Sequence, residues 1–189
     1  MSDNHQPVIR VHDDAVPEDL MLDLMEFINA SGWKYGWHSD GKLQYCHFNQ
    51  KYAYSKKTRI DVGQDLPAPV EAVRRHLEST ILAGMTLIGA YANGYVYGTD
   101  GYPHRDSKHP DDRTIVVYGN PEWKPGWGGE TVFFDKAGDV AKAVTPRWRR
   151  AVVFPSNILH AARTVSRDCV MMRVVMVYKY RVGIPDGQG

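Results

Sequence analysis

The sequence contains little cysteine and no excess of either charge. Its two cysteines, Cys46 and Cys169, lie far apart and lack a metal-binding spacing, which argues against a disulfide framework or a cysteine-ligated metal. This cysteine usage suits a reducing compartment, and we predict a cytoplasmic protein. The 23 Lys+Arg residues balance 22 Asp+Glu residues, whereas nucleic-acid-binding proteins usually show a clear basic excess. We therefore expect a small molecule or another protein as partner, and no nucleic acid.

The chain also lacks a recognisable targeting segment and a clean membrane-spanning run. Residues 1–5 show no basic region followed by an apolar one, so no signal peptide is expected. The uncharged run Ser79–Thr99 is long enough to span a bilayer, but four glycines and three tyrosines interrupt it. We interpret it as a helix end followed by a buried strand, and expect no membrane association. Gly-x-Ser-x-Gly, P-loop and Gly-x-Gly-x-x-Gly motifs are all absent.

The hydrophobic pattern predicts an α+β fold that is mainly β. Helical spacing of apolar residues follows Pro17 as far as Gly32, and a second helix is expected to begin near Pro67. The second half has short segments rich in β-branched and aromatic residues, separated by Gly, Pro and Asp turns: 86–97, 114–118, 131–134, 151–154 and 170–180. Two helices before several strands predict N-terminal helices packed on an antiparallel sandwich or barrel, in a single domain over residues 1–189.

Four His-x-Asp pairs could each contribute two ligands to a metal ion. On an extended backbone, residues i and i+2 face the same way, so an imidazole and a carboxylate can grip one ion. The pairs begin at His12, His38, His104 and His109, so the pattern alone does not choose among them. A 2-His-1-carboxylate site also needs a remote histidine. His160 lies in the strand-rich half, and His104-Arg105-Asp106 follows a strand-like segment, which favours His104, Asp106 and His160.

At this point the sequence resembles the iron(II)- and 2-oxoglutarate-dependent oxygenases, in their prolyl-4-hydroxylase-like branch. Six segments carry the resemblance in the right order over about half of the chain: 91–94, 102–106, 113–123, 127–131, 151–156 with His160, and 173–178. The resemblance implies a double-stranded β-helix, or jelly roll, with the N-terminal helices on one sheet. Residues 85–181 would form the metal-binding core, residues 1–84 its support, and residues 182–189 a tail.

The resemblance also implies the cofactors and their ligands. His104, Asp106 and His160 would hold Fe(II), with 2-oxoglutarate and O₂ at the remaining positions. Arg173, in an otherwise uncharged segment, would pair with the distal carboxylate of 2-oxoglutarate, and Tyr91 would hydrogen-bond the same group. Arg173 lies farther after His160 than the family usually places its basic residue.

Two other arginines, Arg163 and Arg167, therefore remain rivals for the role of Arg173. A carboxylate at Asp106 argues for hydroxylation, because halogenating relatives have a small residue there.

The resemblance leaves the substrate open. The aromatic residues Trp33, Trp37 and Tyr45 and the loop ending at Tyr102 are candidates for its lining, with Trp37 and Tyr102 preferred. We expect hydroxylation of an unactivated C–H of a small molecule, an amino acid or secondary metabolite, with release of succinate and CO₂. The alternatives are a prolyl-type hydroxylase acting on a protein, a non-catalytic cupin-like metal-binding module, and a zinc hydrolase with Glu130 as base. The oligomeric state is left open.

Overall fold

The computed structural model describes residues 8–38, 46–54 and 65–183. Two helices occur in these ranges, α1 (Glu18–Ala30) and α2 (Ala68–Thr80). Each begins directly after a proline, whose fixed φ suits the start of a helix. Helix α1 ends at Ser31, whose backbone N–H and side-chain hydroxyl both donate to the Phe27 carbonyl. Both helices thus lie where the apolar spacing predicts them.

The strands form two antiparallel sheets. The larger sheet has the order β1-β8-β5-β10-β4-β3-β2, and the smaller has the order β7-β6-β9. The larger sheet contains β1 (Arg10–His12), β2 (Lys34–Trp37), β3 (His47–Tyr54), β4 (Met85–Tyr95), β5 (Asp112–Tyr118), β8 (Ala151–Pro155) and β10 (Arg173–Val182). The smaller contains β6 (Thr131–Phe134), β7 (Val140–Val144) and β9 (His160–Ala162).

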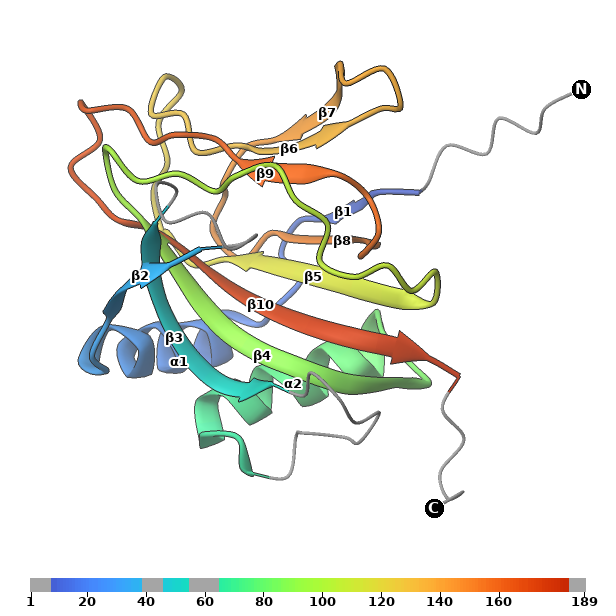
Figure 1. Cartoon of the computed structure of the whole chain (residues 1–189). Coiled ribbons are helices and arrows are strands. Elements are labelled where there is room, and N and C mark those ends of the chain that lie inside the picture. The colour runs from blue at the N-terminus through green and yellow to red at the C-terminus, as the bar shows by residue number, and fades with distance from the viewer. Residues whose placement is uncertain (1–7, 39–45, 55–64, 184–189) are drawn as a thin grey trace, which may run out of the picture.

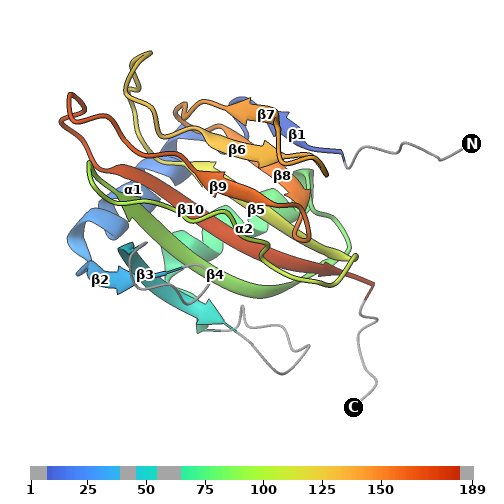
Figure 2. The ribbon, with the colours of Figure 1, turned by 45° about the horizontal axis from the view of Figure 1, so that its top comes forward.

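The sheets and helices form three layers. Helices α1 and α2 cover one face of the larger sheet, and the smaller sheet lies over the opposite face (Figure 1). After a 45° turn that brings the top of the molecule forward, β6 and β9 lie in front of the larger sheet (Figure 2). Side chains of both sheets form a second apolar cluster between them, which includes Phe133 of β6 and Phe154 of β8. This is the jelly roll, with N-terminal helices on one sheet, that the sequence led us to expect.

The alternation of residues along β10 shows how the sequence directs side chains to the two faces of the larger sheet. Its even-numbered residues, such as Met176 and Tyr178, belong to the core under the helices. Odd-numbered residues point to the other face, where Val175 and Val177 join the cluster between the sheets. Arg173 has the same parity and is also buried. The strand alternation therefore turns a guanidinium toward the interior of the jelly roll.

The main strands of the second half were predicted within a few residues of their observed ends. Strands β7 and β9 were not predicted, because β9 has three residues and β7 is largely exposed and rich in alanine. Among the described residues, no helix is long and apolar enough to cross a membrane.

Candidate metal centre

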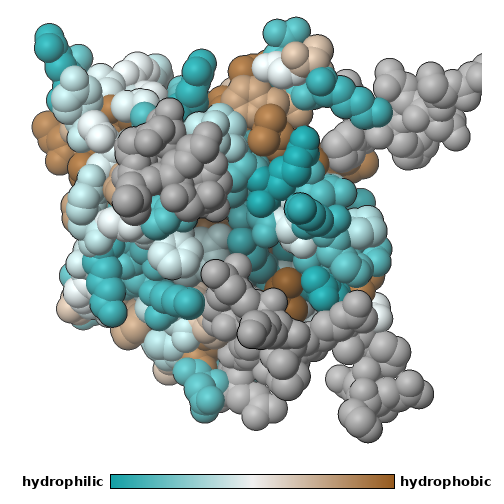
Figure 3. All heavy atoms as spheres, viewed as in Figure 1, coloured by the Kyte–Doolittle hydropathy of each residue, from teal (hydrophilic) through white to brown (hydrophobic). Residues whose placement is uncertain are grey.

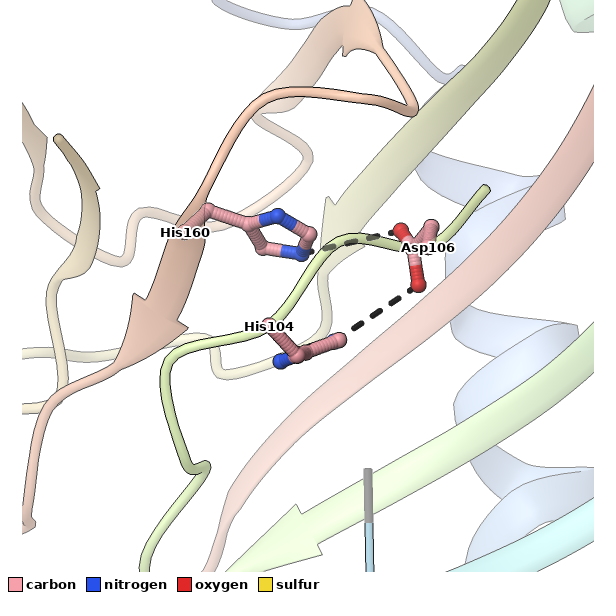
Figure 4. A group of neighbouring side chains, drawn as sticks. All are labelled: His104, Asp106 and His160. Atoms are coloured by element: carbon pink, nitrogen blue, oxygen red, sulfur yellow. Dashed lines mark ion pairs between the residues drawn. The ribbon is translucent and has the colours of Figure 1, made fainter. Parts of the chain in front are cut away.

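Three side chains from two separate segments converge between the sheets. His104 and Asp106 come from the connection between β4 and β5, and His160 begins β9. A β-bridge joins the segments: the His104 N–H donates to the His160 carbonyl at 2.9 Å, and the reverse bond is 3.0 Å. The bridge places the imidazole rings with their centroids 4.5 Å apart, and both rings face the Asp106 carboxylate (Figure 4).

The backbone fixes the tautomer of both histidines. His104 Nδ1 lies 2.6 Å from the Tyr102 carbonyl oxygen, and His160 Nδ1 lies 3.0 Å from the Ile158 carbonyl oxygen. Because a carbonyl oxygen only accepts, each Nδ1 carries the proton and each Nε2 presents a lone pair. Each Nε2 lies 3.6 Å from an oxygen of Asp106. The Nε2 lone pairs of His104 and His160 therefore both point toward the Asp106 carboxylate.

Asp106 is itself held on both oxygens. Thr114 Oγ1 donates to Oδ2 at 2.7 Å, and Lys179 Nζ lies 2.7 Å from Oδ1. Thr114 also bonds to the Ser156 hydroxyl at 2.8 Å, which ties β5 to the end of β8. Burial opposes ionisation of Asp106, but the neighbouring Lys179 ammonium outweighs burial and holds the pKa of Asp106 well below its usual value. The carboxylate is therefore charged at neutral pH.

His160 is kept neutral by its surroundings. It is buried, and its ring makes an edge contact with Phe154 at a centroid distance of 4.7 Å. Burial lowers the pKa of His160 to about 4, against a smaller opposing effect of Asp106. A neutral imidazole is the form that binds a metal.

The donor set fits a metal ion of the Fe(II) type. Ligand atoms of His104, Asp106 and His160 all lie within 4.8 Å of one another. Two imidazole nitrogens and one carboxylate make up the facial triad of non-haem Fe(II) sites, which leaves coordination positions open. His160 is neutral and Asp106 is ionised, so neither of these two ligands has to lose a proton before an ion can bind. Among the described residues, no other three His, Cys, Asp or Glu side chains are grouped in this way.

Arg173 lies in the same pocket as the triad. It is 1% exposed, and its Nε donates to the Gly129 carbonyl at 2.5 Å and its Nη2 to Thr131 Oγ1 at 3.0 Å. The guanidinium lies between the rings of Tyr95 and Tyr118, 5.2 and 5.3 Å from their centroids. No described carboxylate is within ion-pair distance of it. A buried charge in this situation needs an anion for compensation.

Gly129 permits the close approach of this arginine. Its φ is +72°, and a Cβ there would lie 3.0 Å from Arg173 Cδ and 2.9 Å from a ring carbon of Trp123. Gly128 has φ +68°, and a Cβ there would lie 2.5 Å from the Thr164 carbonyl oxygen. Both glycines are therefore required by a positive φ, Gly129 also by its contact with Arg173 and Gly128 also by its contact with the Thr164 carbonyl.

The pocket lies between the sheets and contains about 390 Å³ of empty space, which includes space open to solvent. Tyr91, Asn93 and Tyr95 of β4 line it together with the triad and Arg173. Burial raises the pKa of Tyr95 to about 12 and that of Tyr91 further, so both phenols stay protonated and can donate. The visible face of the molecule shows mainly hydrophilic residues and scattered hydrophobic ones (Figure 3).

Comparison with known proteins identifies the family. Residues 92–181, which contain all three triad residues and Arg173, match the family model described as the 2OG-Fe(II) oxygenase superfamily. The chain belongs to this superfamily. It is an oxidoreductase of the dioxygenase kind, with Fe(II), 2-oxoglutarate and O₂ as its cofactor and cosubstrates. A search of the curated proteins found no match.

Solved structures show the same fold as this oxygenase at low identity. A Pseudomonas putida prolyl-4-hydroxylase is 18% identical, with a TM-score of 0.62, over 93% of this chain and 92% of that one. A 2OG-Fe(II) oxygenase family oxidoreductase from Burkholderia pseudomallei is 15% identical, with a TM-score of 0.71, over 93% and 84%. The α-ketoglutarate-dependent epimerase SnoN from nogalamycin biosynthesis is 11% identical, with a TM-score of 0.59, over 92% and 78%.

The other histidine pairs of the oxygenase lie apart from the triad. His12 is on β1, opposite Ala151, and His38 is partly buried, with Asp40 outside the described residues. His109 Nδ1 lies 3.8 Å from the Asp111 carboxylate on the connection before β5. The requirement for a distant histidine in the strand-rich half therefore selected His104 and Asp106, the pair that the structure groups with His160.

The other residues that the sequence suggested for 2-oxoglutarate or substrate binding lie in several places. Arg163 and Arg167 are exposed and do not line the pocket. Trp37, expected to contact the substrate, instead borders a second groove beside β2, where Lys51 Nζ lies 5.9 Å from its ring centroid. Tyr102 supplies the carbonyl that binds His104, and its side chain is not among those lining the pocket. Tyr45 lies outside the described residues.

Sequence reasoning missed three residues that contact the site of the oxygenase. Thr114 and Lys179 bind Asp106, and Tyr95 lies over Arg173. Lys179 has the same parity on β10 as Arg173, so strand alternation contained a signal for it. Thr114 and Tyr95 show no comparable signal, because many threonines and tyrosines occur in strands.

Proposed function

We propose that this oxygenase hydroxylates an unactivated C–H of a small molecule, with conversion of 2-oxoglutarate to succinate and CO₂. His104, Asp106 and His160 would hold Fe(II). Arg173 would bind the distal carboxylate of 2-oxoglutarate, with Tyr91 and Tyr95 as candidate phenol donors from β4. When bound, Fe(II) supplies the activation of O₂ that the side chains lack.

The burial of Arg173 without a carboxylate partner among the described residues is the observation that supports this proposal. A guanidinium that is 1% exposed and has no described carboxylate partner is costly unless an anion enters with it. Its bonds to Gly129 and Thr131 direct the planar group from one side and leave further N–H groups available. A carboxylate matches this fork bidentately. The same pocket contains the triad, so a keto acid bound at Arg173 is near the metal ligands.

The protein's own groups have simple roles in this reaction. The backbone carbonyls of Tyr102 and Ile158 hold the two imidazoles in the metal-binding tautomer. Thr114 and Lys179 hold the carboxylate ligand. The aromatic walls made by Tyr95 and Tyr118 exclude water from the Arg173 guanidinium, which strengthens its interaction with an anion. No side chain is needed as a nucleophile.

The likeness in fold to the α-ketoglutarate-dependent epimerase SnoN from nogalamycin biosynthesis supports a small molecule as the substrate. A prolyl-type hydroxylase acting on a peptide is the second candidate, favoured by the likeness in fold to the Pseudomonas putida prolyl-4-hydroxylase. A cytoplasmic location is supported by the two widely separated cysteines, Cys46 and Cys169, which are not joined in a disulfide.

A binding experiment tests the cofactor site first. Protein prepared without oxygen is mixed with Fe(II) and 2-oxoglutarate, and the visible charge-transfer band of the ternary complex is recorded. We expect the band in the wild type and its loss in His160→Ala. A wild-type protein that binds Fe(II) but gives no band with 2-oxoglutarate would exclude the proposed function.

A product assay then separates the two substrate classes. Succinate release in the presence of O₂ is measured with a panel of amino acids and other small metabolites, and in parallel with proline-containing peptides. We expect stimulation by a member of the small-molecule panel. Stimulation by peptides alone would assign the prolyl-type activity, and the mass of the product would identify the added oxygen atom.

A further inference from the structure

Three hydrogen-bonded side chains form a chain from β3 to the wall of the pocket. Asn49 Nδ2 donates to Asn93 Oδ1 at 2.7 Å, and Asn93 Nδ2 donates to the Tyr95 hydroxyl oxygen at 3.4 Å. Asn49 and Asn93 are register partners on β3 and β4, and Tyr95 lies two residues beyond Asn93. The three side chains therefore share one face of the larger sheet. All three are buried, and Asn93 and Tyr95 line the pocket.

A backbone carbonyl fixes the orientation of both amides. Asn49 Nδ2 also donates to the Ala92 carbonyl oxygen at 3.1 Å. Because a carbonyl oxygen only accepts, the amide nitrogen of Asn49, and not its oxygen, faces Ala92 and Asn93. The atom of Asn93 that receives this nitrogen is then its oxygen. The amide nitrogen of Asn93 is left to face Tyr95.

This order of donors and acceptors sets the role of the Tyr95 hydroxyl. An amide nitrogen only donates, so the phenol oxygen accepts from Asn93 and its own hydrogen points elsewhere. Among the described residues, no carbonyl or carboxylate accepts that hydrogen. Tyr95 is the register partner of Arg173, whose guanidinium lies 5.2 Å from the centroid of the Tyr95 ring. A phenol donor and a buried cation are thus neighbours at the pocket wall, and both favour an anion.

We propose that Asn49 and Asn93 are positioning residues for the cosubstrate, which keep the Tyr95 hydroxyl as a hydrogen-bond donor to the distal carboxylate of 2-oxoglutarate. With the amide of Asn93 reversed, an oxygen would face the phenol and accept its hydrogen. The amide pair thereby contributes to the selection of 2-oxo acids that have a second carboxylate. This inference rests on the proposed 2-oxoglutarate site, and it adds the residues that make Tyr95 a donor there.

The first test compares two ligands of the protein loaded with Mn(II). Binding of 2-oxoglutarate is measured by calorimetry. Binding of 2-oxopentanoate, which has a methyl group in place of the distal carboxylate, is measured by the relaxation of its methyl protons. We expect Tyr95→Phe to bind 2-oxoglutarate about 10- to 150-fold more weakly than the wild type, and 2-oxopentanoate equally well. The control Tyr97→Phe, at an exposed tyrosine just after β4, should bind both as the wild type does.

The second test reverses the amide chain. Asn93→Asp places an oxygen where Nδ2 now faces Tyr95, and Asn49→Asp removes the donor that holds the oxygen of Asn93 away from Tyr95. Each is made alone and together with Tyr95→Phe, so the added negative charge is present in both members of a pair. We expect Tyr95→Phe to weaken 2-oxoglutarate binding by less than about threefold in either Asp background, because the phenol hydrogen is already bound there.

The outcomes separate this inference from the proposed function. A Tyr95→Phe effect that is absent, or equal for both ligands, would overturn the inference alone. So would an effect that keeps its full size in a folded Asp variant, because Tyr95 would then donate without help from the amides. Thermal unfolding identifies the folded variants, and the ligand comparison in Tyr95→Phe needs neither Asp variant. A wild-type protein that binds Mn(II) but not 2-oxoglutarate would instead overturn the proposed function.

Discussion

Replacing Arg173 by lysine tests the guanidinium as the anchor of 2-oxoglutarate. Lysine keeps the positive charge on a side chain of comparable length but loses the planar fork. In the structure the fork is used on one side by the Gly129 carbonyl and Thr131 Oγ1. The substitution therefore changes the number and direction of hydrogen bonds to a carboxylate while the site stays cationic.

The expected loss of affinity for 2-oxoglutarate follows from the loss of one charge-assisted hydrogen bond. Such a bond is worth about 1.5–3 kcal/mol, and each 1.4 kcal/mol corresponds to about a tenfold change in affinity. Arg173 is 1% exposed, so solvent does not replace the lost bond. We expect Arg173→Lys to bind 2-oxoglutarate about 10- to 150-fold more weakly than the wild type. Metal affinity should change little, because the triad residues are untouched.

The assay is a titration of 2-oxoglutarate into the anaerobic Fe(II) protein, followed by the charge-transfer band. Arg163→Lys and Arg167→Lys are matched controls, since both arginines are exposed and outside the pocket. Thermal unfolding of each variant shows whether Arg173→Lys is folded. The reasoning is refuted if folded Arg173→Lys keeps wild-type affinity, or if either control loses more affinity than Arg173→Lys does.

Three further predictions concern the metal ligands and the pH dependence of stability. His160→Ala should abolish Mn(II) binding in a calorimetric titration while His12→Ala does not; the opposite pattern would reject the triad. His47 is buried, and this burial lowers its pKa to about 4. Since the unfolded chain takes up this proton near pH 6.5, the wild type should lose up to about 3 kcal/mol of stability between pH 7 and 4. Urea denaturation should show a shallower loss in His47→Phe, and an unchanged slope would contradict the assignment. Asp112 is ion-paired with Arg181, which outweighs burial and lowers its pKa. Its contribution is present above the ordinary carboxyl pKa and falls as the pH drops below about 4, so Asp112→Asn should flatten urea-derived stability between about pH 4 and 2; equal curves would disprove it.

The helices and most long strands could be predicted because their burial pattern is local. Apolar residues at helical spacing after Pro17 and Pro67 give α1 and α2, and the β-branched run after Arg173 gives β10. Three-residue β9 has too little sequence for a pattern to be recognised. It is defined by its pairing with β6 and by the bridge between His160 and His104.

The candidate site could likewise be predicted from the sequence only in part. His104, Asp106 and His160 could be selected from sequence, since His-x-Asp after a strand and a histidine in the strand-rich half are visible there. Their convergence, and the isolation of His12 and His109, depend on strand pairing between distant segments. The position of Trp37 in another groove also depends on packing, because an aromatic residue near a turn has the same sequence signature in either place.

The sequence by itself determined the family, the order of the core segments and the residue types available for metal and anion binding. These follow from local periodicity and from a motif order that can be read along the chain. Only the tertiary structure decided which charges meet: Lys179 and Thr114 on Asp106, and Arg173 between Tyr95 and Tyr118. The physical reason is that a strand's alternation fixes the face of a side chain, whereas its partner depends on which strands and loops are brought opposite it.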